Sequence, residues 1–415
     1  MTNYIILVLC IIIILSYLFD ISAKYSKIPG VILLIGLGIV LQVISGTAGL
    51  KIPNIQPLLP VIGTLGLILI VLDASIDLKL EKQKASLLRK SVLSALILLF
   101  LVTTAASFIL VQYFHYTTTA AVLNSIPLGI ISSAVAIPSA GHLSSYEKEF
   151  IIYESSFSDI LGIMAFDFIL FHEGNYSSGL LHYFLAGLLT VVIGVITTSG
   201  LSILLHKIKY HVNYIIIMTA VVLIYALAKM YHLPALLLVL AFGLALSNNK
   251  LVEHTFINKF VDFVKLRQDL DSFRKILGEL TFLVRSFFFI IFGYYTSLEG
   301  IFFPSNLLTA LAITVVILLI RWLFFYFVLR IKSPTLVLFA PRGLITILLF
   351  ISIPVGYMVP EINSEVITLV ILMTLLAMMF GNIISPGETR KTEIQLPLPV
   401  VDEGLTTTSN DSVDS

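Results

Sequence analysis

The sequence predicts an all-α polytopic membrane protein with about thirteen transmembrane helices, and three observations support this fold class. The chain has 415 residues, of which 58% are hydrophobic and only 12% are charged, whereas soluble domains carry about 25% charged residues. Its mean hydropathy is +1.04. Long apolar runs recur between residues 4 and 385, and Lys and Arg collect in every second loop between them.

Each predicted span is an apolar run close to the roughly 20 residues that cross a bilayer as a helix. The first run has no preceding positive charge and no cleavage pattern of small residues, so we interpret it as a span and not as a signal peptide. The predicted spans are residues 4–19, 28–45, 58–76, 91–113, 119–143, 149–171, 180–205, 213–230, 234–247, 277–298, 306–330, 334–357 and 363–385.

The positive charges predict how the chain is oriented. Lys and Arg follow the odd-numbered spans, with the largest groups in residues 79–90 and 250–275, whereas the opposite loops and span ends hold only Lys51 and Lys229. Basic loops stay on the cytoplasmic side of a membrane. We therefore expect a multi-pass protein of the cell (inner) membrane, with its N-terminus outside and its C-terminus in the cytoplasm.

The domain organisation follows from the same pattern. We expect one transmembrane domain over residues 1–387, in which spans 1–6 and 8–13 form two inverted repeats. Segment 248–275 mixes apolar and charged residues at helical spacing, which predicts a cytoplasmic amphipathic linker helix, and the polar residues 388–415 predict a disordered cytoplasmic tail. A single Cys10 excludes an internal disulfide framework, and the net charge of +1 argues against a nucleic-acid partner.

Two predicted spans contain helix-breaking sequences. The fifth span holds two serines, a proline and a glycine within Ser132–Gly141, and Pro341-Arg342-Gly343 interrupts the twelfth. The two spans lie seven apart and therefore cross the membrane in opposite directions. Interrupted helices at matching places of two inverted halves are typical of the midplane site of a secondary transporter. We predict a pair of broken helices that cross near the midplane. Backbone carbonyls at the breaks and nearby hydroxyls are then available to bind a cation.

Glu154 and Asp159 lie well inside the sixth span, where a charged side chain at a helix centre costs about 2.5–3.5 kcal/mol. Ser155 and Asp159 are four residues apart and share a helix face. A carboxylate with hydroxyl oxygens suits a dehydrated monovalent cation, and a proton competes for the same carboxylate, which with alternating access is enough for exchange. We predict Asp159 as the cation- and proton-binding group. The candidate oxygen ligands beside it are Ser132, Ser133, Ser155 and Ser158.

Glu154 needs a positive partner, because an unpaired buried charge is costly. Arg342 and Arg285 are the candidates. Arg321 has no polar or broken segment near it in the sequence, so we interpret it as snorkelling or pairing within the bundle. If Glu154 is permanently paired, only Asp159 cycles, and one proton exchanges for one monovalent cation without net charge movement.

These motifs resemble the monovalent cation:proton antiporter superfamily, in its sodium/proton exchanger branch. Residues 154–159 are similar to the branch's Glu-Ser-x-x-Asn-Asp signature, residues 72–78 to its apolar-Gly-Leu-acidic-Leu turn, and residues 341–343 to its Leu-Arg-Gly motif. The resemblance implies that Asp159 binds the cation and the proton. It also implies that Glu154 pairs with Arg342, that Ser155 supplies an oxygen, and that a homodimer works by elevator-like alternating access without a cofactor.

The chain departs from the branch at two places. The Asn before the key Asp is Ser158 here, so a hydroxyl or a water replaces the amide link to the arginine. The branch's Thr-Asp-Pro in the broken fifth span is Ser132-Ser133-Ala134, which removes one acidic group. Na+ is the favoured ion and K+ stays open.

Two other functions are alternatives. A cation channel using the same helix would lack proton coupling, and an organic-anion symporter would bind the carboxylate of its substrate with Arg342. An enzyme is disfavoured, because the sequence has no HExxH, GxSxG or paired-histidine motif.

Overall fold

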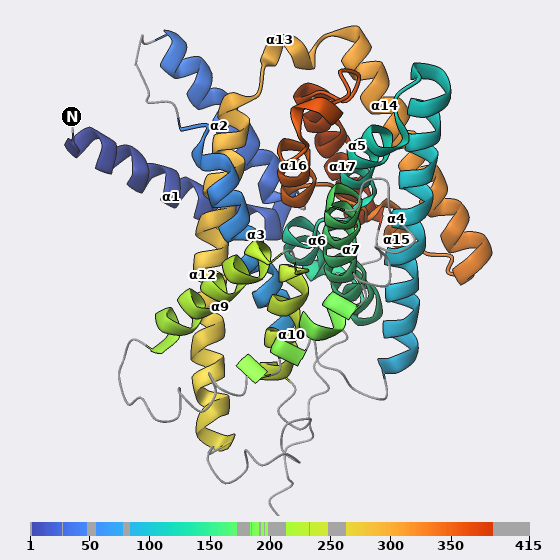
Figure 1. Ribbon diagram of the computed structural model, residues 1–415. Helices are drawn as coiled ribbons and strands as arrows, with labels where there is room; N and C mark the ends of the chain where they lie inside the picture. Colours follow the sequence, from blue (N-terminus) through green and yellow to red (C-terminus); the bar gives the residue numbers. More distant parts are fainter. Residues whose placement is uncertain are drawn as a thin grey trace, which may run out of the picture.

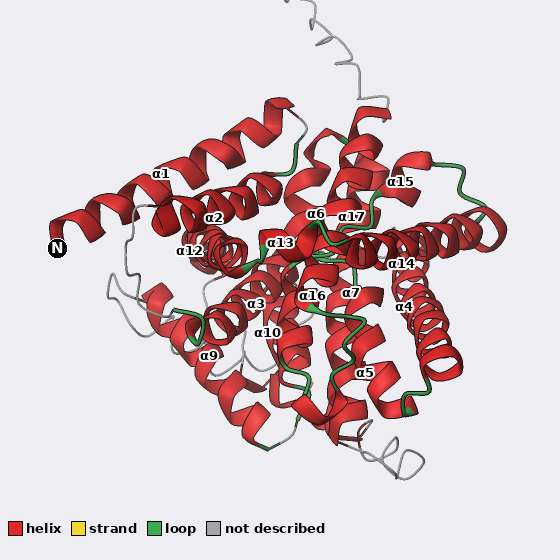
Figure 2. Ribbon diagram, turned by 90° about the horizontal axis from the view of Figure 1, so that it is seen from above, coloured by secondary structure: helices red, strands yellow, loops and turns green. Residues whose placement is uncertain are grey.

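The computed structural model describes most of the chain between residues 2 and 384, and every regular element in the described residues is a helix (Figure 2). The predicted all-α fold class is therefore confirmed. Seven helical segments in this part are long and apolar enough to cross a membrane, and shorter apolar helices accompany them. The count of thirteen spans stays a prediction. The described ranges are 2–26, 28–47, 55–77, 84–171, parts of 183–197, 213–231, 233–247 and 263–384.

One group of helices packs around the long helix α12, and we call it the flanking bundle (Figures 1 and 2). Two glycines allow α2 and α12 to cross closely. A Cβ atom on Gly38 would collide with the carbonyl oxygen of Ile290, and one on Gly293 with that of Ile35, so no larger residue fits there. The bundle consists of α1 (Thr2–Ser26), α2 (Gly30–Thr47), α3 (Leu58–Asp77), α9 (Asn213–Met230), α10 (Ala235–Ser247) and α12 (Phe263–Tyr295).

Most of the remaining helices form a second group, the site bundle, in which α7 packs against α4, α5 and α6, and α17 packs against α14 and α15. Figure 2 shows the two bundles side by side. The site bundle consists of α4 (Ala85–Phe114), α5 (Thr118–Gly129), α6 (Ser133–Ser139), α7 (Ser145–Phe171), α14 (Pro304–Leu323), α15 (Pro334–Leu338), α16 (Leu344–Ile351) and α17 (Ser364–Ile384). Short elements connect these helices: η2 (Ala140–His142), α13 (Leu298–Ile301), the π-helix η4 (Phe324–Leu329) and η5 (Val355–Tyr357).

The two interrupted spans are broken helices. The fifth predicted span is α5 and α6 with residues 130–132 between them, and the twelfth is α15 and α16 with residues 339–343 between them. Ser333 begins α15 as an N-cap, accepting a hydrogen bond from the backbone N–H of Leu336 at 3.2 Å, and Pro334 occupies the first helical position.

The linker before the tenth span differs from the expectation. Helix α12 runs from Phe263 to Tyr295 without interruption, so residues 263–275 belong to the same helix as the tenth predicted span and do not form a separate linker helix. No proline or glycine lies between residues 263 and 277 to end the helix. Residues 248–262, the C-terminal tail and most of the seventh predicted span lie outside the described residues.

Candidate functional site

The two broken helices touch at their interruptions. The backbone N–H of Ser132 donates to the carbonyl oxygen of Pro341 at 2.9 Å. Gly343 lies against the same serine, where a Cβ atom would stand 2.7 Å from Ser132 Oγ. The predicted crossing of the two breaks is therefore present, and it depends on glycine at position 343.

Side chains satisfy the backbone groups that the first break frees. The N–H of Ile131 donates to Ser158 Oγ at 2.9 Å. At the end of α5, the carbonyl of Leu128 accepts from Arg342 Nε at 2.7 Å, and Arg342 Nη1 donates to the carbonyl of Ala340 at 2.9 Å. A cation at a helix C-terminus complements the unpaired carbonyls and the helix dipole. Arg342 and Ser158 therefore hold the crossing together.

Asp159 lies on α7 beside the start of α6 and is 1% exposed. Its Oδ2 accepts two hydrogen bonds from Ser133, one from the backbone N–H at 3.1 Å and one from the hydroxyl. Within the described residues Oδ1 has no hydrogen-bond partner, and the buried hydroxyls of Ser132 and Ser156 have none either. Asp159 is therefore a half-satisfied carboxylate with free oxygens nearby on its own helix and at the break.

The predicted oxygen ligands separate into two groups. Ser133 hydrogen-bonds Asp159 directly, and Ser132 is its neighbour at the break. The other two serines bond elsewhere: Ser155 donates to the carbonyl of Ile151 at 2.7 Å, and Ser158 accepts from the N–H of Ile131. Ser156 was not among the predicted ligands. Its position three residues before Asp159 on the same helix was the signal available in the sequence.

A small recess borders Asp159 at the interface of the two bundles. Ser133, Ser156 and Ile160 line it from the site bundle, and it encloses no volume open to a water molecule. The walls from the flanking bundle are Val71, Ala74 and Ser75 of α3 and Leu240 of α10. Asp159 is therefore closed off from water in this conformation.

Glu154 pairs with Arg321, and the expected pair with Arg342 is wrong. Arg321 Nη1 and Nη2 donate to the two carboxylate oxygens at 2.9 and 2.7 Å, and Ser94 donates its hydroxyl to Glu154 Oε1. Arg321 Nε also donates to the carbonyl of Leu336 at 2.9 Å. Both charges are buried, and a bidentate pair with further hydrogen bonds is the arrangement that offsets their desolvation. The polar groups around Arg321 come from other helices, so its own sequence neighbours carried no signal.

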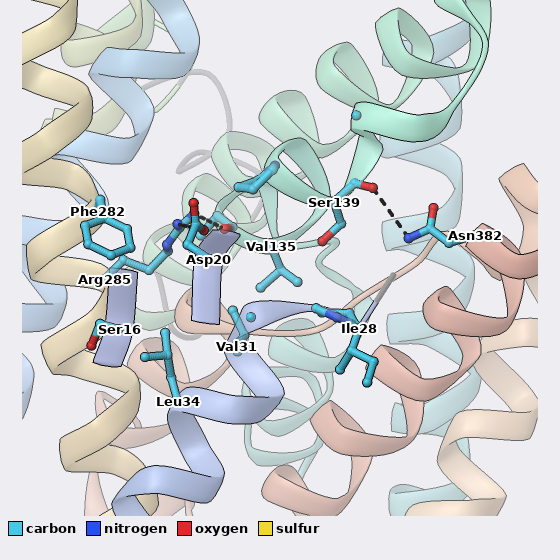
Figure 3. A pocket seen from close by; sticks show the side chains of 15 residues that line it. Ser16, Asp20, Ile28, Val31, Leu34, Val135, Ser139, Phe282, Arg285 and Asn382 are labelled. Atoms are coloured by element: carbon cyan, nitrogen blue, oxygen red, sulfur yellow. Dashed lines mark hydrogen bonds and ion pairs between the residues drawn. The ribbon is translucent and has the colours of Figure 1, made fainter. Parts of the chain in front are cut away.

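Arg285 lies apart from Asp159 and Glu154. Its Nη1 donates to the carbonyl of Ala134 at 2.8 Å, and its Nη2 lies 3.5 Å from Asp20 Oδ1. The side chain borders a cavity of about 380 Å³ between α1, α2 and α12 on one side and α6 and α17 on the other (Figure 3). The expectation that Arg285 neutralises Glu154 is therefore wrong, because its ion-pair partner is Asp20 of the flanking bundle.

Comparison with known proteins identifies the family and the fold. A sequence model of the family described as sodium/hydrogen exchanger, transmembrane, matches residues 8–386. The structure is similar to the sodium proton antiporter MjNhaP1 from Methanocaldococcus jannaschii at pH 8, with a TM-score of 0.68 and 21% sequence identity over 90% of this chain and 98% of that one.

A second structure of MjNhaP1, from an electron-microscopy map, gives a TM-score of 0.63 and 19% identity over 92% of this chain and 95% of that one. No curated protein sequence matches. At these identities the structures establish a shared fold, and the family match over nearly the whole chain establishes the membership. The chain belongs to the sodium/hydrogen exchanger family of multi-pass membrane proteins, which exchange cations for protons.

Proposed function

We propose that Asp159 is the group at which this antiporter exchanges one Na+, or one K+, for one H+. The observation that carries the proposal is the state of this carboxylate. It is buried within a membrane bundle, one oxygen is held by Ser133, and the other is open within the described residues. An intramembrane acid of this kind marks an ion or proton path.

The surroundings of Asp159 supply oxygens for a small cation. The candidate oxygens are the open Oδ1 of Asp159, the hydroxyl of Ser133 that bonds Oδ2, and the buried hydroxyls of Ser132 and Ser156. Hard oxygens are the ligands that alkali cations accept in place of water. A proton on the carboxylate removes the charge that holds the cation, so the two ions bind in turn.

The charges around the site support electroneutral exchange. Glu154 is neutralised by Arg321 in a buried bidentate pair, which leaves Asp159 as the carboxylate that changes its partner. One proton or one monovalent cation on Asp159 leaves the site with the same total charge. Na+ flux through reconstituted protein is then independent of a membrane potential imposed with a gradient of a permeant anion such as thiocyanate. A rate that follows the potential would contradict the one-for-one stoichiometry.

Alternating access explains how a closed carboxylate reaches both sides. Asp159 faces a recess whose walls belong to both bundles, so a displacement of one bundle along the other opens the recess toward one side at a time. The buried Glu154–Arg321 pair joins α7 to α14 within the site bundle, and that bundle is therefore suited to move as a unit.

The assembly and placement of the protein are part of the same proposal. We infer a homodimer in the cell membrane with its N-terminus outside and its C-terminus in the cytoplasm, from family membership and from the distribution of Lys and Arg between alternate loops. Labelling of cysteines introduced at each terminus with an impermeant reagent tests the orientation, and cross-linking in the membrane tests the dimer.

The experiment that tests the site is exchange in proteoliposomes with a preset proton gradient and Na+, K+ or Li+ as the test ion. Asp159→Asn is expected to reduce exchange of every ion to the level of protein-free liposomes. Glu149→Gln on the same helix, at the partly exposed Lys84–Glu149 pair, is the matched control and retains exchange. Exchange by Asp159→Asn at the wild-type rate would overturn the proposal.

The alternatives make different predictions in the same assay. A channel would not let the pH gradient drive a cation uphill. The organic-anion symporter is disfavoured, because the guanidinium of Arg342 is buried and donates to the carbonyls of Leu128 and Ala340.

A further inference from the structure

Besides the pairs of Glu149 and Glu154, a third ion pair of α7 lies about 12 Å beyond Asp159, as the rise of an α-helix gives for eight residues. Lys229 Nζ of α9 lies 2.9 Å from Asp167 Oδ1 and 3.0 Å from Oδ2. The ammonium group therefore contacts both oxygens of the carboxylate.

This pair crosses between the two bundles. Asp167 belongs to the site bundle and Lys229 to the flanking bundle. The Glu154–Arg321 and Lys84–Glu149 pairs each lie within the site bundle. A displacement of one bundle along the other leaves those two pairs intact and separates Lys229 from Asp167.

We propose that the Lys229–Asp167 pair is a gate that opens once in each transport cycle. The inference rests on the alternating access of the proposed function and adds the contact that must break. In the proposed orientation the end of α7 that carries Asp167 points outward, so the structure with this pair formed is closed on the outer side.

The exposure of the two side chains suits a contact that opens repeatedly. The Lys229 side chain is 44% exposed and that of Asp167 is 12% exposed, so the lysine reaches water when the pair separates. Partly exposed pairs contribute little stability. The Glu154–Arg321 side chains, at 1–2% exposed, have no such route to water, and that pair stays closed.

Population shift gives the first test. Lys229→Met and Asp167→Asn each remove the pair and so favour the conformation that is open on the outer side. Both variants are expected to lower the KM for the cation at the outer face and raise it at the inner face, by about two- to fivefold each. Lys84→Met and Glu149→Gln are the matched controls and leave both KM values unchanged. Equal KM values to wild type, or shifts in the same direction at both faces, would show that the pair is not a gate.

Cross-linking gives the second test. Asp167→Cys and Lys229→Cys are combined with Cys10→Ser, the natural chain having a single cysteine, and joined by a short reducible bifunctional thiol reagent. Exchange is expected to stop on cross-linking and to return on reduction. Lys84→Cys with Glu149→Cys, joined in the same way within one bundle, retains exchange.

The outcomes separate the gate from the site. If the protein cross-linked between positions 167 and 229 still exchanges ions, the gate proposal is wrong. Loss of exchange in Asp159→Asn would still support the proposed ion site. Arrest by the cross-link together with full exchange by Asp159→Asn overturns the site and leaves the gate.

Discussion

Two carboxylates on α7, five residues apart and each 1% exposed, have different partners. The Glu154 carboxylate accepts hydrogen bonds from Nη1 and Nη2 of Arg321 and from the hydroxyl of Ser94. In Asp159, Oδ2 accepts hydrogen bonds from Ser133, and Oδ1 has no hydrogen-bond partner within the described residues. Burial is the same for both, so the partners distinguish a carboxylate that holds the bundle together from one that is available to a passing ion.

Amide substitutions give the largest expected effects and separate the two roles. Asp159→Asn is expected to abolish exchange and to change the thermal unfolding temperature little, because no opposite charge is left without a partner. Glu154→Gln leaves the Arg321 charge buried and unpaired, which costs about 3–5 kcal/mol. Thermal unfolding in detergent, with exchange measured on the same preparations, checks both. A loss of stability of equal size in the two variants would contradict the comparison.

Removing both members of the Glu154–Arg321 pair sharpens the comparison. Replacement of a buried ion pair by apolar residues of similar volume is often neutral or stabilising by about 1–4 kcal/mol. The double variant Glu154→Leu with Arg321→Met is therefore expected to recover most of the stability that each single variant loses. Non-additivity in a double-mutant cycle measures this coupling. Additive losses would mean that the two residues stabilise the fold separately.

The third test concerns Ser133, which among the described residues is the hydrogen-bond partner of Asp159. Ser133→Ala removes the hydroxyl donor and a candidate cation ligand but keeps the backbone hydrogen bond, so we expect the KM for the cation to rise about tenfold, or about 1.4 kcal/mol. Ser133→Thr retains the hydroxyl and serves as the control. Initial exchange rates over a range of cation concentrations provide the measurement. A fall in maximal rate at constant KM would assign Ser133 to the conformational change and not to the ion.

The smallest expected effect lies at the break. Ser158→Ala leaves the N–H of Ile131 without its acceptor, which costs about 1 kcal/mol and lowers the unfolding temperature by a few degrees. Ser158→Asn places a side-chain carbonyl at this position and is expected to restore part of the loss. Unchanged stability in Ser158→Ala would show that Ile131 finds another acceptor.

Several features of the site could be predicted from local sequence. The sequence predicted that the fifth and twelfth spans contain broken helices. In the twelfth span Pro341 and Gly343 lie within the break, because proline and glycine act on the backbone of their own segment. In the fifth span the break lies at residues 130–132, before the predicted Pro138, which is inside α6. Asp159 stood out as a charge in an apolar run. Ser133, as a neighbour of the break, was included among its ligands, and it is the residue that bonds Asp159.

The pairings between distant helices could not be predicted in the same way. Arg342 lies in a broken segment and was therefore expected to pair with Glu154. Its guanidinium instead donates to backbone carbonyls where the two broken helices cross. Arg321, in an unbroken apolar run, is 167 positions from Glu154 and forms the pair. Nothing within one segment records which other segment packs against it.

By itself the sequence determined that the apolar runs of the chain are helices embedded in a membrane, because apolar runs of this length satisfy their backbone groups in lipid only as helices. It also indicated which two spans are broken and that Asp159 lies in an apolar run. The tertiary structure alone decided which arginine neutralises Glu154, which hydroxyls face Asp159, and that Lys229 reaches Asp167 across the bundle interface. The physical reason is that charge pairing and ligation depend on distances of about 3 Å between side chains, and those distances exist only after the helices have packed.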